Sequence, residues 1–488
     1  MLCSLDAARG ELSHIASVTA AYGKCEFFFY RGRLYLIGGQ DLLEVGEDGV
    51  AAPNGYVPLV GKNWSDGAVG EPYEAKNLLN HRARISYVMS DPPSSVLRTD
   101  APISSVEAVI QNGEVLPGTS YIIGSARTSV TVKGVSAGDR ITLHFTYQSD
   151  TDGSYALKSC THAEVFGGAV GSRPFLWGGE DGSVMFCAGY VSEDSLRAAQ
   201  LGHPESDALY FPEGREFSVG DGQYSITGVG RHYDRLLIFT EGGAWMADSP
   251  EGSTEEFPLM KINSTVETRS HGKTARLYND PVTVGRSAVY RWSADTDELD
   301  ECNAHSISNS VAPMIEKLLK NGSLFYNRFH NELWLYSQDV SDTVWVYSAT
   351  VGGWTRFGGI RAEGFIALEE GCAFYSGKDI FIFDSALTRD VGGRDVEAFV
   401  LFAPTDMGSP SKKRLSALEL SFSGGELTAQ LLSDEGNIPF CEAKVCGSAI
   451  PKTHRQRICA ARASAFALKL SASSADRQRI YSAGIMIH

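Results

Sequence analysis

Apolar and polar residues alternate along most of the chain, in short runs that end at polar turns. In residues 331–357, Leu333 and Leu335 mark one run, and Val344 and Val346 mark a second run after a polar turn. Alternation with a period of two predicts strands that bury one face. The same pattern returns at residues 25–45, 171–190, 225–248, 271–293 and 364–385. The pattern therefore predicts an all-β protein.

These six stretches share one plan, in which a strand, a short polar turn, a second strand and another turn lead to a strand that ends in an aromatic residue. Beyond the second stretch they recur every 40 to 65 residues, which is the length of one four-stranded propeller blade. None of them could bury both of its faces alone. We therefore predict a six-bladed β-propeller. Residues 1–90 would form an N-terminal segment and the first blade, and residues 155–395 the remaining blades.

Two segments interrupt this rhythm. Residues 91–154 have an alternation of their own, clearest at Ile141, Leu143 and Phe145, and carry turn signals such as Asn112-Gly113. We expect them to form a β-sandwich inserted into a propeller loop. Residues 396–488 contain further alternating strands between polar loops and predict a C-terminal β-sandwich.

Only residues 306–322 have a helical pattern. Ser308 or Ser310 could cap the N-terminus of this helix, and Gly322 would end it.

Charge is distributed unevenly along the chain, whose net charge is −16. From Val396 onward there are 11 Lys and Arg against 8 Asp and Glu, a net charge of +3, so residues 1–395 carry −19. The strong negative charge of residues 1–395 argues against ordinary nucleic-acid binding, because such binding depends on basic residues that neutralise phosphates. It does not argue against a passage through which nucleic acid slides, since repulsion there prevents sticking.

The nine cysteines indicate a reducing compartment. Their number is odd, no two are spaced as C-x-x-C, and several lie in apolar runs, so we expect buried reduced thiols. The first residues have neither a basic start nor an apolar stretch of signal length. No window approaches the roughly 20 apolar residues of a membrane span. These features predict synthesis in the cytoplasm without the Sec pathway.

Signals for catalysis or metal binding are weak throughout the sequence. Residues 134–138 match G-x-S-x-G, but that motif needs a helix after it, and here strands are expected on both sides. The eleven histidines never have the spacing of a zinc site. Residues 150–153 and 295–298 resemble parts of calcium loops without the final Glu, which favours exposed acidic turns over adventitious calcium sites. We expect no catalytic residue, no metal ligand and no cofactor.

Carbohydrate chemistry is the alternative that the repeats themselves suggest. Diglycines and seven tryptophans fall in or near the expected blades, as in kelch propellers. However, no Tyr and Trp follow the diglycines at the constant distances of the kelch pattern. Turn geometry explains the diglycines, and blade packing explains the tryptophans better than a sugar-binding platform does.

The order of the parts carries a family resemblance. The runs LYLIGG, GYVPLV and NLLNHRARISYVM precede the expected insert, and TYQSDTDGSYALKSCTHAEVFGGAVGSRPFLWGG follows it. SISNSVAPMIEKLL, VWVYSATVGGWTRF and TDMGSPSKKRLSALELSF come later. Over most of the chain this order resembles bacteriophage tail structural proteins, in particular the β-propeller hub or nozzle proteins of short tails, often called stabilisation proteins.

The resemblance implies a structural virion protein of the tail, assembled in the cytoplasm of a bacterial host, and not an enzyme. Several copies, expected to be six, would form a ring around the DNA exit channel. That ring would dock to a head-to-tail adaptor and offer its outer face to tail fibres, spikes or a plug, while viral DNA passes through transiently. The resemblance brings no catalytic residues.

A basic loop on this acidic protein is the expected partner contact. It comprises Lys412, Lys413 and Arg414 in the run SPSKKR, and an ordinary solvated turn is the alternative. Two other functions stay open, namely a glycan-binding adhesin and a carbohydrate-active propeller enzyme such as a lyase, hydrolase or kelch-type oxidase.

Overall fold

A computed structural model describes most of the chain. The described residues are 2–6, 11–18, 25–47, 49–148, 154–167, 171–248, 258–269, 272–293, 303–339, 342–384, 387, 389–390, 393–433, 436–473 and 478–487. The protein is all-β and built from many antiparallel sheets, as predicted. It divides into two compact units, Met1–Phe381 (unit 1) and Ile382–His488 (unit 2). No helix among the described residues is long and apolar enough to cross a membrane.

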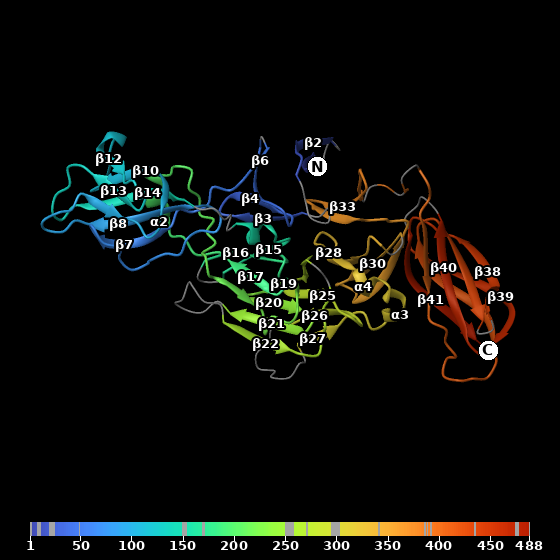
Figure 1. Ribbon diagram of the computed structural model, residues 1–488. Coiled ribbons are helices and arrows are strands. Elements are labelled where there is room, and N and C mark those ends of the chain that lie inside the picture. Colours follow the sequence, from blue (N-terminus) through green and yellow to red (C-terminus); the bar gives the residue numbers. More distant parts are fainter. Residues whose placement is uncertain are drawn as a thin grey trace. The chain divides into compact units, whose positions relative to one another are not determined.

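Unit 1 contains six antiparallel sheets that follow one another along the chain, each around one of the six predicted stretches (Figure 1). The first two are β3 (Glu26–Tyr30), β4 (Arg33–Ile37), β5 (Leu42–Gly46) and β6 (Gly49–Ala51), then β15 (His162–Phe166), β16 (Arg173–Trp177), β17 (Val184–Cys187) and β18 (Glu216–Ser218). The third is β19 (Ile226–His232), β20 (Arg235–Thr240), β21 (Gly243–Asp248) and β22 (Leu259–Asn263), with β23 (Gly272–Lys273) parallel to β19.

The last three sheets continue the same plan. The fourth and fifth are β24 (Ala275–Leu277), β25 (Asp280–Val284), β26 (Val289–Trp292) and β27 (Ala304–Ser306), then β28 (Ser323–Asn327), β29 (Glu332–Tyr336), β30 (Thr343–Ser348) and β31 (Gly353–Gly358). The sixth is β32 (Gly364–Leu368), β33 (Gly371–Ser376) and β34 (Asp379–Ile382). A hairpin of β1 (Leu2–Asp6) and β2 (Glu11–Ala16) precedes them all.

The first strands of successive sheets lie beside one another. β15 contacts both β3 and β19, β19 contacts β25, and β28 contacts β24 and β25. Neighbouring sheets among the first five share apolar cores, which no sheet of this size could form by itself. The polar turns between first and second strands contain residues with positive φ: Arg31, Tyr233, Tyr278 and Asn331. Tight hairpins need this left-handed conformation, so the repeated polar turns of the sequence are a true structural repeat.

The insert consists of two further sheets between the first and second of these six. A five-stranded sheet has the order β11-β10-β14-β8-β7, and a three-stranded sheet has the order β12-β13-β9. Their strands are β7 (Leu59–Ser65), β8 (Arg82–Val88), β9 (Val96–Arg98), β10 (Ile103–Gln111), β11 (Glu114–Val115), β12 (Tyr121–Ile123), β13 (Ser129–Val132) and β14 (Arg140–Tyr147). Ile141, Leu143 and Phe145 lie in their shared core, as the alternation predicted.

The insert begins earlier than the expected residue 91. β8 pairs with β14 along its whole length, and β7 lies parallel to β8. The apolar side chains of this segment, such as Ile85 and Tyr87, are buried in the core of the insert. Residues 59–88 therefore belong to the insert and not to the first blade, because their strands pair with a strand about 55 residues further along the chain.

Unit 2 consists of two sheets that share one core. The four-stranded sheet has the order β35-β40-β37-β38 and the three-stranded sheet the order β39-β36-β41. Their strands are β35 (Glu397–Leu401), β36 (Lys413–Ser423), β37 (Glu426–Ser433), β38 (Gly436–Cys446), β39 (Lys452–Ala463), β40 (Phe466–Ser473) and β41 (Arg479–Ile487). Leu418 and Phe422 of one sheet pack with Leu431 and Phe466 of the other, which matches the C-terminal sandwich expected from residue 396.

Helices are few and short among the described residues. They are α1 (Tyr155–Lys158), α2 (Glu193–Gln200), α3 (Ala312–Ile315), α4 (Leu318–Asn321) and the 3-10 turn η2 (Gly118–Ser120). The predicted helix over residues 306–322 is present only as α3 and α4, although its apolar face is buried at Ile315, Leu318 and Leu319. The sequence pattern did not reveal α2, whose N-terminus is capped by the hydroxyl of Ser192, the acceptor of the Ser195 N–H.

Candidate functional site

The predicted partner contact lies at the start of β36 in unit 2, and its three basic residues differ in their roles. The Lys413 ammonium donates to the backbone carbonyls of Ser411 at 3.1 Å and Ser464 at 3.2 Å, and also to that of Ser409. Lys412 and Arg414 are exposed. Lys413 therefore holds its own turn in place, and the partner contact stays a prediction for Lys412 and Arg414.

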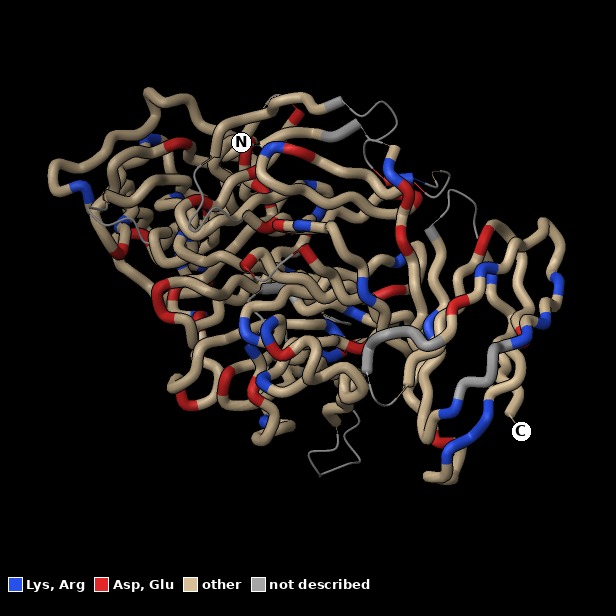
Figure 2. Tube along the Cα trace, turned by 90° about the vertical axis from the view of Figure 1, so that its right-hand side faces the viewer, with Lys and Arg blue, Asp and Glu red and all other residues tan. Residues whose placement is uncertain are grey.

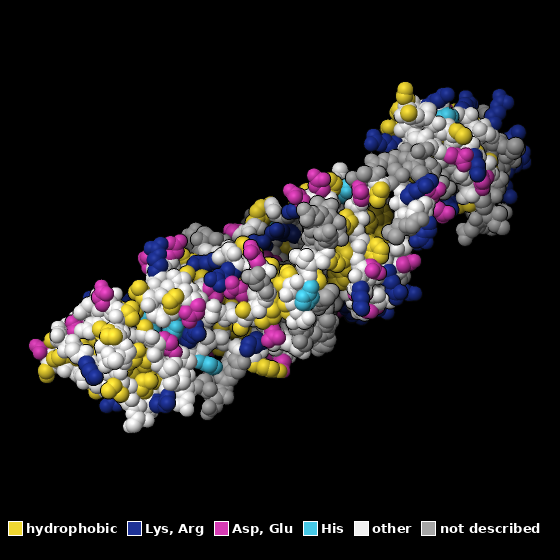
Figure 3. Space-filling view, turned by 90° about the horizontal axis from the view of Figure 1, so that it is seen from above, with side chains coloured by type: hydrophobic (Ala, Val, Ile, Leu, Met, Phe, Trp, Pro, Cys, Tyr) yellow, Lys and Arg dark blue, Asp and Glu magenta, His cyan; other side chains and the backbone are white. Residues whose placement is uncertain are grey.

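A second basic surface lies on β39, an edge strand of unit 2. Lys452, Arg455, Arg457 and Arg462 are all exposed on it. Lys and Arg recur along the strands of this unit in Figure 2, and several of their side chains project from it in Figure 3. The positive charge that the sequence places after Val396 is thus carried largely by strands, and not by the SPSKKR turn alone.

The other notable surface of unit 2 is apolar. Every residue of β35 is exposed, and the strand is an edge of its sheet. The most exposed apolar side chains in and beside it are Val396 at 53%, Phe399 at 54%, Val400 at 49%, Leu401 at 52% and Phe402 at 44%. An apolar edge strand offers another chain unpaired backbone groups, and it also offers apolar surface that the other chain would shield from water.

The motifs of the sequence that suggested catalysis or metal binding precede unit 2. The G-x-S-x-G run forms the hairpin turn between β13 and β14, where the Ser136 N–H donates to Asp139 Oδ2 at 2.7 Å. The strand β14 follows it, whereas the nucleophile motif requires a helix at that place. No group of three or more His, Cys, Asp or Glu in the described segments could hold a metal ion. Residues 150–153 and 295–298, the fragments of calcium loops, lie outside the described residues.

Five of the seven tryptophans are buried packing residues, and Trp245 and Trp354 are half-buried. Trp177 and Trp292 are fully buried, and Trp64, Trp334 and Trp345 are nearly so. Trp64 lies in the core of the insert, while the others lie in the six-sheet region. Their burial favours the packing interpretation over sugar binding.

Of the seven described cysteines, two are buried, three are half-buried and two are exposed. Burial raises the pKa of Cys160, Cys187 and Cys372 to about 12 in each case, which keeps them protonated and unreactive. Cys25 and Cys446 are exposed. These residues agree with the expectation of reduced cysteines.

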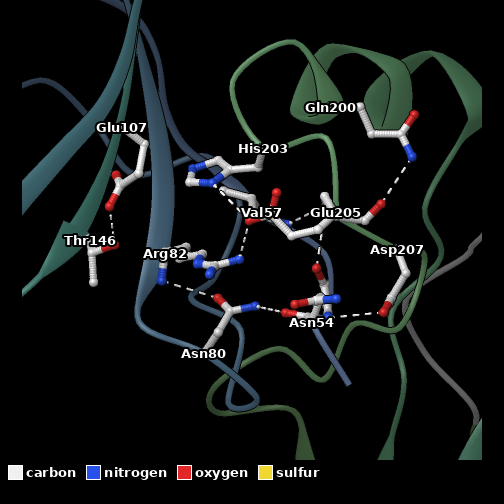
Figure 4. A network of polar contacts seen from close by, with 12 residues as sticks. Asn54, Val57, Asn80, Arg82, Glu107, Thr146, Gln200, His203, Glu205 and Asp207 are labelled. Atoms are coloured by element: carbon white, nitrogen blue, oxygen red, sulfur yellow. Dashed lines mark hydrogen bonds and ion pairs between the residues drawn. The ribbon is translucent and has the colours of Figure 1, made fainter. Parts of the chain in front are cut away.

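A polar network joins the insert to the segment that follows α2 (Figure 4). Arg82 Nη1 of β8 lies 2.6 Å from Glu205 Oε1. The Asn80 amide donates to the Asn54 carbonyl at 2.7 Å, and its oxygen accepts from the Arg82 N–H at 3.0 Å. The Gln200 amide donates to the Ser206 carbonyl at 2.9 Å. The Arg82–Glu205 ion pair links the inserted sheet to residues 200–206, and the other contacts order the segments on either side of it.

A buried pair of histidines lies next to this network. His144 of β14 and His203 are 0% and 1% exposed, and their ring centroids are 5.3 Å apart. Neither ring nitrogen of His144 has a hydrogen-bond partner, and neither does Nε2 of His203. Burial, aided by the charge of Arg84, lowers the pKa of His144 to about 2, and burial also lowers the pKa of His203. Both rings are therefore neutral at pH 7.

Because His144 and His203 are buried as neutral rings, we expect acid to destabilise unit 1. Because the unfolded side chain has its ordinary pKa of 6.5, the unfolded state binds a proton below that pH while the folded state does not. The stability is therefore present above pH 6.5 and is lost as the pH falls. His144 alone should reduce the free energy of unfolding by about 2 kcal/mol between pH 7 and pH 5.

Urea unfolding of the wild type and His144→Phe at both pH values measures this loss. The other titrating groups are common to both proteins and cancel in the comparison. His330→Phe, at an exposed histidine, should follow the wild type. An equal loss in His144→Phe and the wild type would show that the buried ring does not resist protonation.

No family model and no curated protein matches the chain. Similar solved structures include the core factor of S. cerevisiae, 7% identical with a TM-score of 0.31, over 63% of this chain and 56% of that chain. They also include an exo-beta-1,3-galactanase from Phanerochaete chrysosporium, 8% identical with a TM-score of 0.20, over 97% and 99% of the two chains. The extracellular domain of a hybrid two-component system from B. thetaiotaomicron is 8% identical with a TM-score of 0.32, over 99% and 69%. The chain thus spans little more than half of the core factor chain, and likenesses at these scores indicate no function.

Proposed function

We propose that this chain is a structural subunit of a bacteriophage tail, a hub or nozzle protein whose copies form a ring around the DNA exit channel. In this proposal the six successive sheets of unit 1 are the blades of a six-bladed β-propeller. The insert leaves the propeller between its first and second blades, as loop insertions commonly do. The chain order of sheets, insert and C-terminal sandwich supports the proposal.

The observation that carries the proposal is the apolar edge strand of unit 2. Val396 to Phe402 expose five large apolar side chains on one edge of a sheet, where soluble monomers normally place charges or proline. A neighbouring copy that covers this strand would remove the apolar surface from water. Assembly, and not turnover, is then the activity, with binding energy from extended protein–protein contacts.

The proposed partners follow from this placement. Copies of the chain, expected to be six, associate with one another, and the ring docks to a head-to-tail adaptor. Fibres, spikes or a plug bind its outer face, and Lys412 and Arg414 are proposed to contribute to such a contact. The acidic body, with a net charge of −19 over residues 1–395, lets DNA pass without adhering. The protein would be located in the virion tail after assembly in the cytoplasm of the bacterial host.

Electron microscopy of the purified full chain, together with mass measurement over a range of concentrations, tests this proposal. We expect closed five- or six-fold rings at high concentration, alone or on an added adaptor ring. A chain that stays monomeric at high concentration and has no affinity for an adaptor ring would overturn it.

A further inference from the structure

A hollow of about 410 Å³ lies between the inserted sheet and α2. Its floor is the outer face of the sheet, with Arg84 from β8 and Thr142 and His144 from β14. Ala198 and Leu201 form its other wall. The site is therefore assembled from a strand pair and a helix far apart in the sequence, and it has room for a small molecule.

The lining of the hollow is positively charged. It contains two guanidinium groups, Arg84 and Arg140, and no Asp or Glu. Arg84 is only 3% exposed, and its guanidinium donates to the Val57 carbonyl at 3.0 Å and to the Tyr56 hydroxyl at 2.9 Å. No carboxylate lies within ion-pair distance of either arginine among the described residues. The Glu74 carboxylate reaches Arg84 only through the Tyr56 hydroxyl, which donates to Glu74 Oε2 at 3.1 Å. A buried cation with no direct counter-ion is costly, so an anion in the hollow would be favoured.

The nearby carboxylates already have partners. Glu205 pairs with Arg82 at 2.6 Å. Glu107 accepts from the Thr146 hydroxyl at 2.6 Å, and Asp139 accepts from the amide of Asn112 at 2.9 Å. None of the three lies within ion-pair distance of Arg84 or Arg140 among the described residues.

His144 supplies a second, independent indication of a ligand. It lies directly opposite Arg84 in the register of β8 and β14, it is fully buried, and it lines the hollow. Neither of its ring nitrogens has a hydrogen-bond partner among the residues that the structure describes. Buried polar groups are nearly always satisfied, and an oxygen atom held beside the Arg84 guanidinium could accept the imidazole N–H.

We propose that this hollow binds a small oxyanion, a carboxylate or phosphate group, held between the guanidinium groups of Arg84 and Arg140 and accepting a hydrogen bond from His144. The shared chemistry is a planar or tetrahedral oxyanion, for which arginine is the preferred partner. The bound ion joins the inserted sheet to α2. This site does not depend on the proposed tail function, since it lies within unit 1.

Calorimetric titration and thermal unfolding of the full chain test the site. Inorganic phosphate and citrate are added separately at constant ionic strength, so that the two arms distinguish a phosphate from a carboxylate ligand. We expect saturable binding of at least one probe and a rise in Tm that follows its concentration. Absence of saturable binding by both probes overturns the proposal.

Two variants locate the binding. Arg140→Ala, at an exposed position, should weaken binding about tenfold, as loss of one charge-assisted contact does. His144→Phe should weaken binding and also raise the Tm without added anion, because it removes two unsatisfied buried nitrogens.

Arg276→Ala is the matched control. Arg276 is an exposed arginine of β24 that lines no part of the hollow, and the variant should bind like the wild type. Equal weakening in Arg140→Ala and Arg276→Ala would show that only the net charge matters and would also overturn the site.

Discussion

Replacing Asn77 with alanine should lower the free energy of unfolding of unit 1 by about 3–5 kcal/mol. Asn77 is 2% exposed, and its amide donates to the carbonyls of Tyr56 at 2.8 Å and Leu209 at 3.1 Å. Its oxygen accepts from the backbone N–H groups of Leu79 at 3.2 Å and Phe211 at 3.0 Å. One side chain thus satisfies four backbone groups from three segments, and alanine would leave the N–H groups of Leu79 and Phe211 without this acceptor, while the Leu209 carbonyl keeps the Tyr56 N–H at 2.8 Å.

Urea unfolding followed by tryptophan fluorescence measures this effect cleanly. All seven tryptophans lie in unit 1, between Trp64 and Trp354, so the signal reports on that unit alone. Asn80→Ala is the matched control, since its amide makes a more exposed contact with the Asn54 carbonyl, and it should cost about 1 kcal/mol or less. Equal losses in the two variants would contradict the role assigned to Asn77.

The double variant Phe399→Lys and Leu401→Lys should abolish self-association. The two residues are two positions apart on β35, so their side chains point to the same face of the sheet. If a neighbouring copy covers that face, each apolar side chain contributes about 1.5 kcal/mol or more on burial. Losing both corresponds to a Kd about 100-fold higher or more. The new lysines would also repel Lys469, which lies 5.0 Å from the Phe399 ring centroid.

Analytical ultracentrifugation of this variant measures the change in assembly state. Ile450→Lys is the matched control, because Ile450 is 76% exposed in the same unit but lies outside its strands. It should assemble like the wild type, and both variants should unfold in unit 1 at the wild-type urea concentration. Rings that persist in the double variant would place the interface elsewhere.

Strand positions, turns and buried faces could be predicted from the sequence. Alternation marks the face that a strand buries, as at Ile141, Leu143 and Phe145, and polar turns mark the hairpins. Both signals are local, because they depend on neighbouring residues in one strand. The packing interpretation, too, fits the five tryptophans that are buried.

The pairing of distant strands could not be predicted in the same way. β8 has the alternation of any half-buried strand. This alternation does not show whether β8 pairs with β14 or with a strand of the first blade. The boundary of the insert was therefore misplaced. The helix over residues 306–322 was overestimated, since its apolar face is compatible with two single turns as well as with one continuous helix.

What the sequence by itself determined is the set of strands and the face of each strand that is apolar. Only the tertiary structure decided what covers the polar faces. Arg84 and His144 occupy polar positions of alternating strands, where water is the default neighbour, yet the segment of α2 encloses them. Lys413 belongs to a charged run, yet backbone carbonyls surround its ammonium group. The physical reason is that periodicity records the local preference of each side chain, whereas enclosure depends on which distant segment packs against it.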